Sequence, residues 1–211
     1  MITLTSSLEF SHFPVMLSEI IQIASPEKGG LFIDCTFGGG SYSNALLKFP
    51  KTKVIGIDRD EAVISRANEL QKKYQKRFKF YQIKFSELDK ILNKNADTII
   101  FDLGLSSIQL KNLNRGFSFK SKNKLDMAMG LNNISAQEAV NNLSEKHLKL
   151  IIKILGEETE ASNIAKNIIK ARSENKITKV NELVEIIEKS KKKNYSSKIN
   201  PSTKTFQALR I

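Results

Sequence analysis

Three acidic residues follow short apolar runs in the first half of the chain, in positions suited to binding a ligand. Asp34 comes four residues before the glycines at 38–40, Asp58 ends a second apolar run, and Asp102 ends another. Parallel strands bring their carboxyl ends to one edge of a sheet, and open α/β sheets bind ligands along that edge. The sequence therefore predicts that the three carboxylates share one site.

The glycine-rich segment indicates a nucleotide-bearing ligand. Glycines let the backbone turn sharply into a helix and approach a ligand closely, and the helix then offers free N–H groups. A full dinucleotide fingerprint would need glycine at position 43, where the chain has Ser43. An acid at the strand end suits an ammonium group, which S-adenosylmethionine carries. Asp34, Gly38 and Gly40 are thus candidate cofactor residues, although a turn without a ligand would have a similar composition.

Asp58 lies 24 residues after Asp34, a spacing at which a carboxylate accepts hydrogen bonds from a ribose. It could instead cap a helix that starts near Asp60, since aspartate favours that position. Together with the glycine-rich segment it indicates an adenosine-bearing cofactor. These residues do not separate NAD from S-adenosylmethionine.

Asp102 is followed by Gly104, Ser106 and Ser107. Methyltransferases that act on amino groups keep their catalytic loop after such a strand-end acid, and a carboxylate there can accept a hydrogen bond from an exocyclic amine. Asp102 is therefore the candidate catalytic residue. An ordinary polar turn is the alternative.

The segments around these residues alternate between strand and helix patterns. This rhythm predicts an α/β fold with a Rossmann-like parallel sheet and right-handed crossovers. Four strands are fewer than a complete nucleotide-binding sheet has, so the sheet is expected to be incomplete. Strands are predicted at 31–36, 54–58, 78–83 and 98–102, and helices at 41–49, 61–74 and 86–92.

The second half changes to a long polar loop followed by helices. Ser135 and Glu138 have the spacing of a capping box, and apolar residues recur at helical spacing beyond it. Helices are predicted at 135–155, 157–172 and 180–192, with another starting at 205–211. We expect a cofactor-binding core at 1–134, an inserted helical subdomain for RNA recognition at 135–200, and the start of a return to the core at 201–211.

Positive charge is concentrated in the second half. The net charge is +12, of which residues 1–102 contribute +2 and residues 103–211 contribute +10. A chain rich in Lys, Asn and Ile could reflect an AT-rich genome, but that would spread the charge evenly. The asymmetry favours an RNA partner. The candidates for phosphate contacts are Lys120, Lys122, Lys124 and the lysines at 191–193, each of which could also be plain solvated surface.

The cysteine content and the lack of long apolar runs bear on the cellular compartment and on metal binding. Cys35 is the single cysteine, so no internal disulfide can form, and no apolar run is long enough for a membrane span. Residues 1–10 lack the pattern of a signal peptide. We expect a cytoplasmic protein without a metal site, since His12 and His147 are far apart in sequence and there is no cysteine pair. The oligomeric state is left open.

Several ordered stretches resemble the bacterial ribosomal RNA small subunit methyltransferase H family, and they span nearly the whole chain. They are His12-Phe13-Pro14-Val15-Met16-Leu17, 33–40, 56–60, 102–107 with Gln109, Arg115-Gly116-Phe117-Ser118-Phe119, Leu125-Asp126-Met127 and 203–211.

The resemblance implies S-adenosylmethionine-dependent methylation of the exocyclic N4 of a cytidine in small-subunit ribosomal RNA. It also implies a helical domain inserted into the methyltransferase sheet. By position, it assigns the methionine part of the cofactor to Gly40, Ser41 and Tyr42, the ribose to Asp58, the adenine to Phe85, and further cofactor contacts to Asp102 and Gln109.

The chain departs from the family pattern at a few positions. Ser41 and Tyr42 stand where the family usually has glycine and histidine, Ala128 where it has arginine, and Asn200 where histidine is common. The family also continues well beyond residue 211, so we expect a carboxyl-terminally short member. Two other functions are kept open: a non-catalytic RNA-binding fragment and an NAD-linked Rossmann oxidoreductase.

Overall fold

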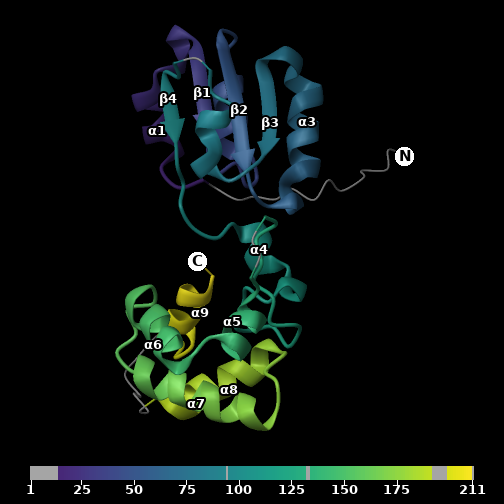
Figure 1. Ribbon diagram of the computed structural model, residues 1–211. Coiled ribbons are helices and arrows are strands. Elements are labelled where there is room, and N and C mark those ends of the chain that lie inside the picture. The colour runs from purple at the N-terminus through teal and green to yellow at the C-terminus, as the bar shows by residue number, and fades with distance from the viewer. Residues whose placement is uncertain (1–13, 94, 132–133, 192–198, 211) are drawn as a thin grey trace, which may run out of the picture. The chain divides into compact units, whose positions relative to one another are not determined.

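The computed structural model describes residues 14–93, 95–131, 134–191 and 199–210. It divides the chain into two compact units, residues 1–108 and 109–211, each of which is described by itself (Figure 1). Within the described residues, no helix combines the length and the apolar character that crossing a membrane requires.

The first unit is built on a four-stranded parallel sheet, which confirms the predicted α/β, Rossmann-like fold. Its strands are β1 (Gly30–Asp34), β2 (Thr52–Asp58), β3 (Phe78–Gln82) and β4 (Thr98–Ile100), in the order β3-β2-β1-β4. In the register, Asp34 at the end of β1 is opposite Gly56 of β2 and Ile100 of β4. The strand order reverses between β1 and β4, so the sheet has a topological switch point there.

Short helices connect these strands, close to the predicted ranges. The first unit contains α1 (Leu17–Ala24), α2 (Ser41–Leu47), α3 (Ile64–Tyr74) and the 3₁₀ helices η1 (Pro26–Lys28), η2 (Glu61–Val63), η3 (Gln75–Arg77) and η4 (Phe85–Lys90). The helix predicted at 86–92 is the 3₁₀ helix η4. Helix α3 packs on β3, as Figure 1 shows. Helix α4 (Ser107–Lys111) contains the boundary between the two units.

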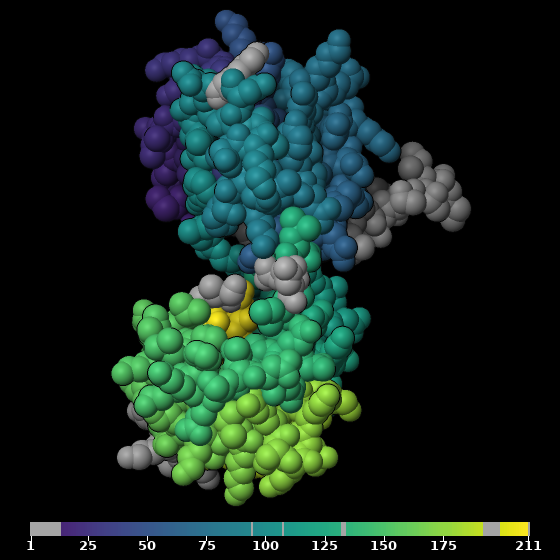
Figure 2. Space-filling view, in the orientation of Figure 1, coloured from purple at the N-terminus to yellow at the C-terminus, as the bar shows by residue number. Residues whose placement is uncertain are grey.

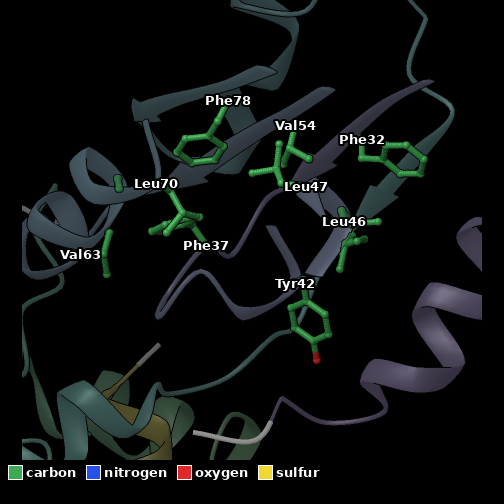
Figure 3. Close-up of a cluster of buried hydrophobic side chains, with 11 residues drawn as sticks. Phe32, Phe37, Tyr42, Leu46, Leu47, Val54, Val63, Leu70 and Phe78 are labelled. Carbon is green, nitrogen blue, oxygen red and sulfur yellow. The ribbon is translucent and has the colours of Figure 1, made fainter. Parts of the chain in front are cut away.

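An aromatic cluster anchors the loop that follows β1. The ring of Phe37 is buried and packs against Phe78, at a centroid distance of 5.7 Å, and against Phe80, at 5.2 Å. Figure 3 shows Phe37 and Phe78 within the cluster of buried hydrophobic side chains to which Tyr42 and Leu46 of α2 also belong. Because Phe37 is fixed in the core, the glycines that follow it leave the sheet from a defined point.

The second unit is helical. It contains η5 (Leu113–Arg115), α5 (Ala136–Asn142), α6 (Glu145–Ile154), α7 (Ala161–Glu174), α8 (Val180–Ser190) and α9 (Thr203–Leu209). The capping box is confirmed: the Ser135 hydroxyl accepts from the Glu138 amide, and the Glu138 carboxylate accepts from the Ser135 amide. The single helix predicted at 135–155 is two helices, because Leu143 is extended and Ser144 caps α6 by accepting from the amide of His147.

The division between the two compact units falls between Ile108 and Gln109, and the functional boundary expected at 134/135 stays a prediction. The loop after η5 belongs to the helical unit: the Leu125 amide donates to the Thr178 carbonyl, and the Val180 amide donates to the Asn123 carbonyl. The segment expected to return to the core also packs in the second unit, where Phe206 of α9 is fully buried. The functions assigned to 1–134, 135–200 and 201–211 remain predictions.

Candidate functional site

The loop after β1 has a backbone that only glycine adopts readily. Gly38 and Gly40 have φ values of +48° and +72°. A Cβ on Gly40 would lie 2.6 Å from the ring of Phe37, whereas a Cβ on Gly39 would meet no described atom within 4 Å. Gly40 is therefore required for the shape of the loop, and the backbone at Gly39 is open to a ligand.

Asp58 ties this loop to the end of β2. Its Oδ2 accepts a hydrogen bond from the Gly38 amide at 2.8 Å, and its Oδ1 accepts one from the Asp60 amide at 2.9 Å. Burial raises the pKa of the Asp58 carboxyl. The cap of η2 is Asp60, whose side chain accepts from the Ala62 amide. Each oxygen of Asp58 keeps a second lone-pair site, so the carboxylate can still accept two hydroxyl groups.

Asp34 lies buried beneath the loop. Its Oδ2 accepts a hydrogen bond from the Ser43 hydroxyl at 2.7 Å, and its Oδ1 has no hydrogen-bond partner among the described residues. Burial raises its pKa to about 6, against an opposing effect of the Ser43 hydroxyl. Ser43, which breaks the dinucleotide fingerprint, is thus the polar partner of Asp34. Since Asp34 has no exposed surface, it presents its charge from below the loop.

Asp102 is joined to the loop across the switch point of the sheet. Its amide donates to Thr36 Oγ1 at 2.7 Å. The Tyr42 hydroxyl lies 3.2 Å from Asp102 Oδ2 and 2.6 Å from the carbonyl oxygen of Val15, and both are within donating distance. Burial, with the negative charge of Asp102, raises the pKa of Tyr42 to about 12. The structure thus brings Tyr42 and Asp102 into direct contact.

Two aromatic rings are exposed beside these residues. Phe85, which begins η4 after β3, is 46% exposed, and Phe101, which follows β4, is 50% exposed. Their rings pack edge to face with centroids 5.5 Å apart. The resemblance pointed to Phe85 alone, and Phe101 was missed. Its signal in the sequence is an aromatic residue directly before Asp102. Exposed aromatic faces suit a purine base.

The remaining predicted residues lie in different places. Ser41 opens α2 and is partly exposed, whereas Gln109 of α4 is buried and belongs to the second unit. The other predicted cofactor residues all lie in the first unit, at the loop and the strand ends. Among the described residues, no three His, Cys, Asp or Glu side chains are grouped for a metal ion.

The lysines predicted to contact phosphates have different surroundings in the structure. The side chains of Lys120, Lys122 and Lys124 are exposed. Lys191 instead forms an ion pair with buried Glu158 at 2.6 Å and donates to the carbonyl of Pro201, and positions 192 and 193 lie outside the described residues. Lys191 is therefore a structural residue of the helical unit.

Helix α6 exposes a basic face that sequence reasoning missed. Lys146, Lys149 and Lys153 are exposed on it, together with Leu150 and Ile154, which are 51% and 61% exposed. This segment is part of the green surface of the second unit in Figure 2. The three lysines, spaced by three and four residues, share one side of the helix.

A parallel sheet with a glycine loop after β1, an acid at the end of β2 and another after β4 is the nucleotide-binding architecture that class I, Rossmann-like methyltransferases have. The model of the MraW methylase family matches residues 9–211, and the chain belongs to this family.

The relatives found are proteins named ribosomal RNA small subunit methyltransferase H. Those of Rickettsia massiliae (strain Mtu5) and Orientia tsutsugamushi (strain Boryong) are each 43% identical to this chain, over 202 and 205 residues. That of Rickettsia canadensis (strain McKiel) is 41% identical over 208 residues. The alignments cover 95% to 97% of this chain and 66% of each relative, so the chain spans about two thirds of their length.

Proposed function

We propose that the protein transfers a methyl group from S-adenosylmethionine to the exocyclic N4 of a cytidine in small-subunit ribosomal RNA. The observation that carries the proposal is the direct contact of Asp102 with Thr36 of the loop and Tyr42 of α2, at the switch point of a sheet in a member of the MraW methylase family. The names of the relatives supply the class of RNA. Such a substrate would place the protein in the cytoplasm.

The residues at the strand ends fit S-adenosylmethionine. Asp58 has a free lone-pair site on each oxygen for the ribose hydroxyls, and Phe85 with Phe101 offers aromatic surface for the adenine. The open backbone at Gly39 and the negative charge of Asp34 below it suit the methionine part, which ends in an ammonium group. Gly38, Gly40, Ser41, Tyr42 and Gln109 complete the proposed set of cofactor residues.

The same loop argues against an NAD-linked oxidoreductase. In the dinucleotide fingerprint, the third glycine lets the helix pack closely on the strand. This chain has Ser43 there, and its buried hydroxyl is committed to Asp34. A buried, negatively charged carboxylate under the loop also disfavours a pyrophosphate.

Asp102 would assist the attacking nitrogen. The cofactor supplies an electrophilic methyl group on a sulfonium centre. The amino nitrogen of cytosine is a weak nucleophile, because its lone pair is delocalised into the ring. A hydrogen bond from the amine to Asp102 favours the nucleophilic form. Transfer of the methyl group to the nitrogen would leave the cofactor as a neutral thioether, and Asp102 would take up the proton that the nitrogen loses and pass it to solvent.

The rest of the rate enhancement would come from positioning the methyl donor and the acceptor nitrogen. Holding donor and acceptor in line contributes on the order of several kcal/mol. The target base must leave its stack to reach a carboxylate at the strand end.

Contacts to the RNA backbone are proposed for the second unit. The exposed lysines of α6 and Lys120, Lys122 and Lys124 have no ion-pair partner among the described residues. Lysines of this kind neutralise phosphates and release counterions, so the affinity should fall steeply with salt. The uneven charge also supports a second candidate function, RNA binding without catalysis.

The experiment is transfer of a tritiated methyl group from S-adenosylmethionine to unmethylated small ribosomal subunits, with Asp102→Asn as the test variant. Asp89→Asn, at an exposed carboxylate of η4, is the matched control. We expect the label on one cytidine with the wild type and Asp89→Asn, and a large loss with Asp102→Asn. Salt-dependent RNA binding without any transfer would favour the second candidate.

A further inference from the structure

We infer that Tyr42 is a positioning residue, whose hydroxyl orients the carboxylate of Asp102 and couples it to the carbonyl of Val15. The contacts themselves are independent of the proposed function, whereas their catalytic consequence rests on it. The two distances are 3.2 Å from the hydroxyl to Asp102 Oδ2 and 2.6 Å to the Val15 oxygen.

The ring of Tyr42 is held firmly. It is 4% exposed and belongs to the buried cluster that includes Leu46 and Phe37. Figure 3 shows the ring at the border of this cluster, with its hydroxyl oxygen directed away from the labelled apolar side chains. Because a buried tyrosine has few rotamers, the position of its hydroxyl is set by the packing of the core.

Asp102 depends on this contact for its orientation. Its backbone amide is fixed by Thr36, but the Tyr42 hydroxyl is the partner of its side chain among the described residues. The bond engages Oδ2 and leaves Oδ1 without a hydrogen bond in the described part of the chain. Tyr42 thereby holds one oxygen of the carboxylate and leaves the other for a ligand.

The Val15 carbonyl lets Tyr42 serve both protonation states of Asp102. A phenol has one hydrogen, which can bond only one of its two acceptors at a time. When Asp102 is ionised, the hydroxyl can donate to Oδ2. When Asp102 has taken up a proton, the hydroxyl can turn to Val15 and accept a hydrogen bond from the acid. This arrangement suits a group that gains and loses a proton in each turnover.

The contact can be tested by NMR of the protein labelled with ¹³C at Cζ of its tyrosines. The Cζ signal of Tyr42, assigned by its absence in Tyr42→Phe, should shift as the pH is lowered from neutral into the acid range, because its hydroxyl contacts a carboxylate. Asp102→Asn should abolish this shift. The negative charge of Asp34 also acts on Tyr42, so Asp34→Asn identifies the part of the shift that belongs to Asp34. A shift that is unchanged in Asp102→Asn would overturn the inference.

Kinetics then test the positioning role. Tyr42→Phe keeps the ring and removes the hydroxyl, and Tyr74→Phe is the control, because the Tyr74 hydroxyl donates to Asn44 Oδ1 in a similar part-buried bond. For Tyr42→Phe we expect kcat to fall about tenfold, the value of one such hydrogen bond, whereas Tyr74→Phe should leave kcat unchanged. Equal effects of the two variants would contradict the role. If the wild type transfers no methyl group, the proposed function fails and the NMR result still decides the inference.

Discussion

Replacing Asp34 by asparagine should change how the stability of the protein depends on pH. Asp34 is fully buried, and its pKa is raised from 3.8 to about 6 because burial disfavours the charged form. At about 1.4 kcal/mol for each pH unit, keeping it ionised in the folded state costs about 3 kcal/mol at neutral pH. Asp34→Asn removes the charge and keeps the shape of the side chain.

The direction of this pH dependence follows from the number of protons that the folded and unfolded states bind. Between pH 3.8 and about 6 the folded state retains a proton that the unfolded state has released. The contribution of Asp34 to stability therefore falls as the pH rises through this range, and it stays constant above it. The gain from Asp34→Asn should be about 2–3 kcal/mol larger at pH 8 than at pH 4.

The assay is urea unfolding of the wild type and the variant at both pH values. The asparagine amide leaves a buried donor where Oδ1 already lacks a partner, at a cost of roughly 1–3 kcal/mol. That cost does not vary with pH, so the difference between the two pH values isolates the charge. Asp89→Asn, at an exposed site, is the control. A difference between variant and wild type that is the same at pH 4 and pH 8 would refute the reasoning.

Two further predictions concern the loop and the helical unit. Gly40→Ala should lower the free energy of unfolding by more than about 1 kcal/mol in denaturant unfolding, because Gly40 has a φ of +72° and an added Cβ would clash. Gly39→Ala, where an added Cβ meets no described atom, should change it by less than about half that amount. Equal losses in the two variants would contradict this account of the loop. Lys191→Met should cost about 3 kcal/mol, because it leaves Glu158 charged and buried. Lys189→Met, which breaks an exposed ion pair, should cost no more than about 0.5 kcal/mol by thermal unfolding, and a comparable loss in both would argue against a structural role of the buried pair.

The sheet was predictable because its signals are local. Apolar runs that end in Asp34 and Asp58 gave β1 and β2 to within two residues at each end, and the capping box at Ser135 gave the start of α5. The break between α5 and α6 was missed, because apolar spacing continues across Leu143. The signal that marks it is Ser144, a residue type that favours helix starts.

The candidate site residues were named one by one at the sequence level, but the contacts between their side chains were not predicted. The strand-end pattern singled out Asp102 and the family resemblance pointed to Tyr42, yet their contact spans 60 positions and depends on the strand order. The same holds for Phe101, whose ring contacts that of Phe85 because η4 lies in the connection from β3 to β4, the two outer strands of the sheet. Pairings of this kind depend on tertiary structure, which patterns within one segment do not contain.

The most direct test of the central claim is calorimetric titration with S-adenosylhomocysteine, with NAD as the competing ligand. Asp58→Asn keeps the shape of the side chain but replaces one of the two oxygens, which accept the Gly38 and Asp60 amides and would accept the ribose hydroxyls, by a donor group. It should therefore weaken binding about tenfold or more, while Asp89→Asn should not. Binding of S-adenosylhomocysteine that is selective over NAD and sensitive to Asp58 is the result we predict. Equal binding of NAD, or no binding by the folded wild type, would contradict it.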